Sequence, residues 1–140
     1  MTKNRWDDRG SVAVETAVVA PALVALLLLV VFAGRVSQAE GDVRRAASEA
    51  SRAASLRQHP DGAETTATEV AASNLSASGV ACGTLETDVD TTNFAPGGTV
   101  TVTVRCTASM RDVSLLAVPG SRPFVARSVE VIDRHRGADQ

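Results

Sequence analysis

One carboxylate, that of Glu15, lies inside an otherwise apolar run. From Val12 to Ala33 there are 22 residues, and Glu15 is the only one of them that carries a charge. A helix of that length spans about 33 Å, enough to cross a hydrocarbon core of about 30 Å. An ionisable side chain in such a segment costs at least about 2.5 kcal/mol on insertion scales, so we expect it to have a partner.

Three interpretations of this N-terminal region compete. A cleaved secretory signal is disfavoured for two reasons. The apolar run is longer than such signals need, and Ala33-Gly34-Arg35 is a poor cleavage site for signal peptidase. A plain signal anchor with an incidental glutamate is the second. The third is a prepilin-type signal, in which a short charged leader ends at Gly10 and a glutamate follows at the fifth position after it.

The third interpretation rests on Gly10, Glu15, Pro21, a Leu/Val run and the exit Gly34-Arg35. With these features, the stretch from about Arg9 to Ala54 resembles the TadE-like proteins, pseudopilins of the tight-adherence (Flp) pilus machinery. The resemblance implies that a prepilin peptidase cleaves between Gly10 and Ser11 on the cytoplasmic side. It also implies that other pilins or pseudopilins contact the chain through its N-terminal helix.

Cleavage at Gly10 would give Glu15 a partner. The new α-amine of Ser11 would be a cation at the membrane's edge, and a carboxylate beside it stabilises both charges in a low dielectric. We therefore predict that Glu15 of one subunit neutralises the amine of its neighbour. The alternative is that Glu15 reaches the cytoplasmic interface and pairs with Arg9 or a lipid headgroup. Pro21 is predicted to kink the helix, or else reflects the higher proline content of membrane helices.

Residues 34–77 are predicted to form a stalk helix and a second helix. Apolar residues recur at three- and four-residue steps from Val36 to Ala54, which is typical of one buried helical face. His59-Pro60 is expected to end the stalk, because proline disfavours helical geometry in the residue before it. The second helix is expected from about Ala63 to Ser76.

Residues 78–133 are predicted to form a small antiparallel sheet of about three strands. Thr99–Cys106 alternates strictly and is the clearest half-buried strand. Partners are expected at Thr84–Asp90 and Phe124–Ile132. A hairpin folded about residue 94 would place Cys82 opposite Cys106, where a disulfide is feasible; two reduced, buried cysteines are the alternative.

The predicted fold class is therefore α+β, with a leader at 1–10, a transmembrane helix at 11–33 and a frayed tail at 134–140. A net charge of −2 gives no excess of positive charge for binding nucleic acid. No catalytic constellation, metal site or cofactor site is predicted, since His59 and His135 are isolated from other ligands.

The leading functional expectation is a non-enzymatic minor pilin or pseudopilin in the bacterial membrane, with its C-terminal part outside the cytoplasm. The alternative is a membrane-anchored binding module, or an accessory of a secretion complex, that does not polymerise.

Overall fold

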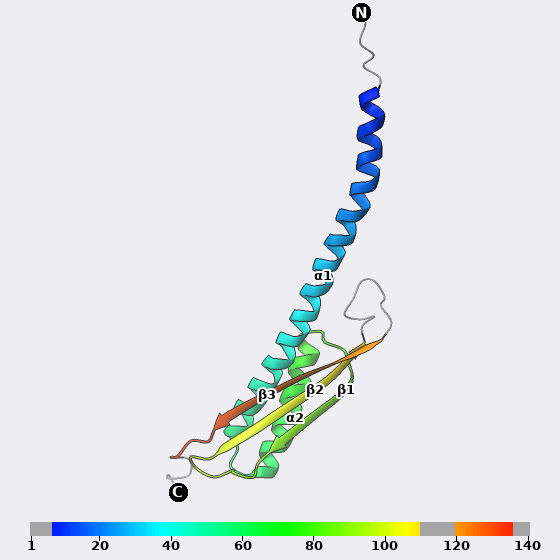
Figure 1. Cartoon of the computed structure of the whole chain (residues 1–140). Helices are drawn as coiled ribbons and strands as arrows, with labels where there is room; N and C mark the ends of the chain where they lie inside the picture. Colours follow the sequence, from blue (N-terminus) through cyan, green and yellow to red (C-terminus); the bar gives the residue numbers. More distant parts are fainter. Residues whose placement is uncertain (1–6, 110–119, 136–140) are drawn as a thin grey trace, which may run out of the picture. The chain divides into compact units, whose positions relative to one another are not determined.

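The first described element is one long helix, α1 (Asp7–Ser55) (Figure 1). The computed structural model describes residues 7–109 and 120–135, with side chains from residue 14 onward. The leader residues 1–6 and the tail residues 136–140 of the sequence prediction lie outside these ranges. The chain divides into two compact units, Met1–Gly34 and Arg35–Gln140. The second unit is called the head below.

The head is a three-stranded antiparallel sheet covered on one face by helices. Its further elements are α2 (Pro60–Ala77), β1 (Cys82–Asp90), β2 (Thr99–Ser109) and β3 (Ser121–Val131). The strand order is β1-β2-β3, so β2 is central and the other two are edges. Figure 1 shows the C-terminal part of α1 and all of α2 on the same side of the sheet. The predicted α+β class with three strands is confirmed.

The core is built from valines of the sheet and alanines of the helices. On β2 the even positions Val100, Val102 and Val104 are fully buried, as the alternation predicts. The helices contribute small side chains, which let their backbones approach the sheet closely. The buried helix residues are Ala39, Val43, Ala46, Ala47, Ala50 and Ala54 of α1, and Ala63, Ala67, Ala71 and Leu75 of α2.

A buried polar contact joins α1 to the edge strand β3. The hydroxyls of Ser51 and Ser128 are hydrogen-bonded at 2.8 Å, and the Ser51 hydroxyl also lies 2.9 Å from the Ser48 carbonyl oxygen. Because Ser51 is fully buried, this pairing satisfies a group that would otherwise cost free energy to bury. It also fixes α1 against the β3 side of the sheet.

The helix boundaries differ slightly from the sequence prediction. α1 ends at Ser55, and α2 begins at Pro60, three residues earlier than expected. Proline suits the first helical turn, where its missing N–H would have no intrahelical partner and its φ is already helical. Pro60 thus starts one helix as well as separating it from the other.

The hairpin register is where the sequence prediction was wrong. Cys82 lies opposite Ala108, and Cys106 lies opposite Leu85, with an irregularity between Cys82 and Thr84. The hairpin folds about a point later than residue 94, because the turn uses Gly97, which has a φ of +80°. Gly98 is required as well, since a Cβ there would overlap the Asn93 carbonyl oxygen.

Two hydrogen bonds link Asp90, the last residue of β1, to Thr92 in the turn that follows. The Thr92 hydroxyl and amide both donate to the Asp90 carboxylate, at 2.7 and 3.0 Å. These bonds hold the pKa of the Asp90 carboxyl below its usual value, and the positive charge of Arg127 adds to the effect. A carboxylate at this position is therefore kept ionised.

The predicted disulfide between Cys82 and Cys106 is confirmed despite the shifted register. The two Cα atoms are 5.3 Å apart, within the range of about 4.4–6.8 Å that such bonds need. Cys106 is fully buried beside the core valines, so the bond ties the start of β1 to the centre of the sheet.

Removing this bond is expected to destabilise the head. The double variant Cys82→Ala/Cys106→Ala should lose about 3–4 kcal/mol of unfolding free energy, because the bond closes a loop between residues 24 apart. Denaturant unfolding of the full chain in detergent measures this, and reductant should lower the stability of the parent chain but not of the variant. Equal stabilities, or thiols that alkylate without reduction, would contradict the disulfide.

Candidate assembly and processing segment

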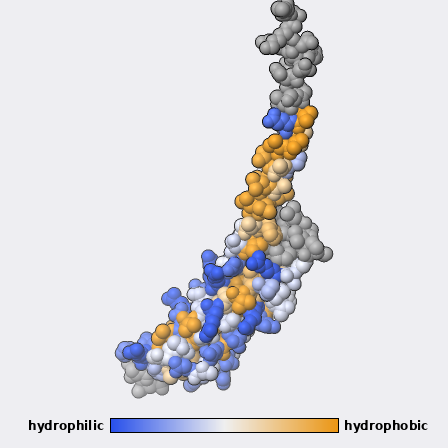
Figure 2. Space-filling model, viewed as in Figure 1, coloured by the Kyte–Doolittle hydropathy of each residue, from blue (hydrophilic) through white to orange (hydrophobic). Residues whose placement is uncertain are grey.

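Large apolar side chains cover the described part of α1 before the head begins. Leu23, Leu27 and Leu29 are each about three-fifths exposed, at 59%, 62% and 63%. Figure 2 shows the hydrophobic colouring gathered along this part of α1, whereas the head is mostly hydrophilic. A helix that is apolar all round requires a nonpolar environment.

This segment is long and apolar enough to cross a membrane. The described residues contain one helix that meets the length and composition of such a span, and it lies near the N-terminus. That finding fits a single-pass membrane protein.

All four predicted processing and assembly residues lie on α1. Gly10 and Ser11 are in helical backbone, because α1 begins at Asp7 rather than after the leader. Glu15 is exposed, and Pro21 lies inside the helix. Proline has no amide hydrogen, so the Ala17 carbonyl lacks its usual helical donor at this point.

The helical start has a consequence for cleavage between Gly10 and Ser11. Because both residues lie in helical backbone, a peptidase that takes an extended substrate must first unwind the beginning of α1. Isolated helix ends open readily, since their first amides have no intrahelical acceptors. The roles of Gly10, Ser11, Glu15 and Pro21 stay predictions.

Comparison with known families bears on this same stretch. The model of the family described as TadE-like protein matches residues 10–52. This region is therefore similar to the TadE-like proteins. The match begins at Gly10 and includes Glu15 and Pro21, so it confirms the resemblance drawn from those residues. No curated protein and no solved structure matches the chain significantly.

The TadE-like match points to a protein associated with the Tad pilus system. The matched residues cover the apolar segment of α1 and most of its continuation as far as Arg52. The rest of the head, with α2 and the three strands, lies outside the match.

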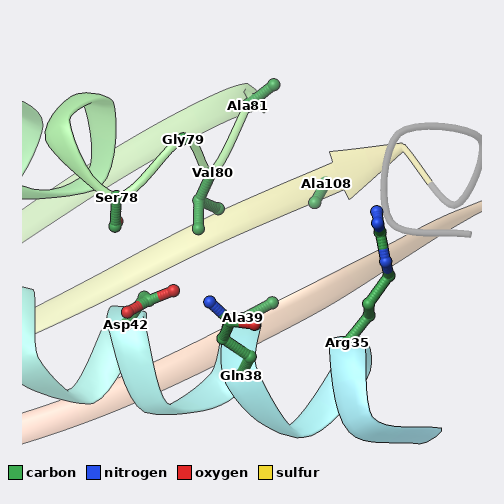
Figure 3. A pocket seen from close by; sticks show the side chains of 9 residues that line it. All are labelled: Arg35, Gln38, Ala39, Asp42, Ser78, Gly79, Val80, Ala81 and Ala108. Carbon is green, nitrogen blue, oxygen red and sulfur yellow. The ribbon is translucent and has the colours of Figure 1, made fainter. Parts of the chain in front are cut away.

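The head has an open cavity of about 300 Å³ between α1, the segment after α2 and the end of β2 (Figure 3). Arg35, Gln38 and Asp42 reach it from successive turns of α1, and Val80 and Ala108 lie across from them. Its lining combines one cation and one carboxylate with small and amide side chains. It brings together no pair of groups suited to nucleophilic or acid–base chemistry.

Among the side chains described, those of residues 14–109 and 120–135, no three His, Cys, Asp or Glu are placed to hold a metal ion. The surface that sequence reasoning missed lies at the edges of the sheet. It was signalled by a long stretch, 58–104, that contains no Lys or Arg but six acidic residues. The topology places α2 and β1, which carry all six of these acidic residues, side by side.

Charges placed in the apolar segment are expected to weaken its membrane partitioning. Leu26→Arg combined with Leu27→Arg should raise the apparent free energy of insertion by about 5–7 kcal/mol, since each arginine near the centre of a span costs about 2.5–3.5 kcal/mol. The matched control is Leu56→Arg with Val125→Arg, because both leucine and valine are exposed residues of the head. Flotation of the full chain with lipid vesicles measures membrane partitioning of the test and control variants. Equal loss of flotation in the two would contradict membrane anchoring by α1.

Proposed function

We propose that this chain is a membrane-anchored pseudopilin, or minor pilin, that takes part in assembly of a Flp-type pilus. It is made as a precursor, and a prepilin peptidase removes the leader after Gly10. The mature chain, beginning at Ser11, is held in the bacterial membrane by the apolar part of α1. The head is extracytoplasmic and is carried outward when the subunit enters a filament.

The observation that carries this proposal is the coincidence of the TadE-like match with the exposed apolar part of α1. A helix with so much exposed apolar surface is stable in lipid or against other apolar helices. A pilus subunit meets both surroundings in turn. It leaves the membrane and packs its helix among the helices of its neighbours.

Glu15 gives such packing a defined register. A carboxylate among apolar helices is costly unless a cation lies beside it. The amine released on Ser11 is a cation four residues away in sequence, and in a staggered helical array the amine of the next copy meets the carboxylate. Pro21 leaves the Ala17 carbonyl open to a neighbour's donor in the same region.

We also propose that the role is structural rather than enzymatic. The head supplies a folded surface stabilised by its disulfide, and partners are other pilins, the peptidase and the membrane. A non-polymerising anchored binding module is the competing function, and the two experiments below separate it from a pilus subunit.

The first experiment measures the N-terminus. Intact mass of membrane-extracted protein from cells with the peptidase should correspond to a chain starting at Ser11. Gly10→Leu should abolish this trimming, because a bulky side chain would occupy the position next to the scissile bond. Gly34→Leu is the control, since a Cβ at Gly34 meets no atom within 4 Å. A chain that retains Met1 in the parent protein would contradict the proposal.

The second experiment tests the role of Glu15. Glu15→Ala should leave membrane insertion and trimming intact but reduce piliation by at least about tenfold, since loss of one buried pair costs more than 1.4 kcal/mol. Glu40→Ala removes a carboxylate from the same helix but breaks only an exposed pair with Arg44, so piliation should be unchanged. Electron microscopy of cells measures pilus number, and normal piliation with Glu15→Ala would refute the neutralising role.

A further inference from the structure

Charge is divided unequally between the two sides of the head. α2 and β1 contain no Lys or Arg, and the stretch 58–104 that includes them has six acidic residues. The sequence ranges 35–57 and 105–135, apart from residues 110–119, contain nine arginines and five acidic residues. Because α2 packs on β1 and α1 is bonded to β3, the acidic residues of this stretch gather on the β1 side of the head, where Arg105 of β2 faces Glu86 across the hairpin.

The acidic side has a groove between α2 and β1. It is open, has a volume of about 510 Å³, and is lined by Glu64, Glu69 and Asp88 together with threonines and one valine. The buried Thr87 Oγ1 beside it has no hydrogen-bond partner among the described residues. We call this groove, with the outward carboxylates of β1, the acidic edge; its acidic members are Glu64, Glu69, Glu86, Asp88 and Asp90.

The opposite edge, β3, presents apolar and cationic side chains. Val125, Val129 and Val131 are 55%, 52% and 66% exposed on the sheet face that the helices leave uncovered. Arg127 lies among them on the same face. We call these four residues the valine edge. Edge strands that expose β-branched side chains and unpaired backbone groups favour association with another strand.

We propose that the acidic edge of one copy binds the valine edge of a second copy, with Arg127 against Asp88 and the groove beside it. The two edges carry opposite charge, so they attract each other, whereas two acidic edges repel. β1 and β3 run in the same direction, because each is antiparallel to β2. Two copies of the same orientation can therefore align β3 of one beside β1 of the next.

This contact is heterologous, so it leaves an acidic edge open on one copy and a valine edge open on the other. Such contacts repeat along a line or helix of subunits instead of closing into a dimer. The inference rests on the proposed function, because copies anchored by the same helix in one membrane share one polarity. It adds a second contact, between heads, to the contact proposed between N-terminal helices.

The test is a charge swap read by cross-linking of the full chain in vesicles of phosphatidylcholine, a lipid without net charge. A photoreactive benzophenone amino acid at Val129 should cross-link to residues 60–90 of a second copy. Asp88→Arg alone and Arg127→Asp alone should each lower the yield about three- to tenfold, since each places like charges at the contact. Mixing the two single variants should restore the yield, because the intact acidic edge of the Arg127→Asp chain then meets the intact valine edge of the Asp88→Arg chain, and the two mutated edges also carry opposite charges.

Arg45→Asp is the matched control. It makes the same change in net charge as Arg127→Asp, but Arg45 is an exposed residue of α1 and belongs to neither edge, so the yield should stay within about twofold of the parent. Formation of the Cys82–Cys106 bond in every variant shows that the head has folded.

Three outcomes would overturn the inference: unchanged yields in both single variants, no rescue on mixing, or cross-links only to lipid or to Val129 of the other copy. The vesicles contain no peptidase and no pilus machinery, so the cross-linking yield reports on the head contact alone. Failure of the swap with normal trimming and a Glu15-dependent pilus would refute only the head contact. Rescue on mixing with an untrimmed chain would refute only the pilus role.

Discussion

The apolar surface of residues 14–33 requires a nonpolar cover, and the described residues leave that surface exposed. Hydrophobic burial is the largest favourable term in protein association, so such a helix is held by lipid, by copies of itself, or by each in turn. A single carboxylate, that of Glu15, lies within this apolar segment and limits which arrangements are stable. Insertion tolerates it near the interface, whereas packing among helices requires a cation beside it. The proposed trimming after Gly10 supplies that cation and links processing to assembly.

The head has a small core of modest apolar burial, and its disulfide adds to its stability. Its core is made chiefly of alanine and valine, with Phe124 as the one buried aromatic residue among those described, so apolar burial per residue is modest. Small side chains allow close packing of two helices on the sheet, but they contribute less free energy than larger ones. The Cys82–Cys106 bond offsets this by restricting the unfolded chain. A bond of this kind persists in an oxidising compartment, which agrees with the proposed extracytoplasmic location of the head. The helices protect one face of the sheet and leave the other, with its charged and valine-bearing edges, available for contact.

Much of this could be predicted from sequence because the decisive patterns are local. Strict alternation in Thr99–Cys106 defined the central strand, and the alanine periodicity defined the buried face of α1. The cysteine pairing was correct although the register was not, because a turn with Gly97 at positive φ and an irregular strand start shift the hairpin without separating the two Cα atoms beyond reach. The acidic groove and the valine edge could not be read in advance. They depend on α2 packing beside β1 and on which strands are edges, and both are set by tertiary contacts.

The central claim is that the carboxylate of Glu15 meets the α-amine of Ser11 in a neighbouring copy. Filaments assembled from equal amounts of ¹⁵N-labelled and unlabelled subunits can be treated with a carbodiimide, which joins adjacent amines and carboxylates without a spacer. The account predicts a cross-linked peptide pair, Ser11 to Glu15, in which half of the linked pairs combine one labelled with one unlabelled chain. Links found only within single chains, or a Glu15 that never links to an N-terminal amine, would contradict it.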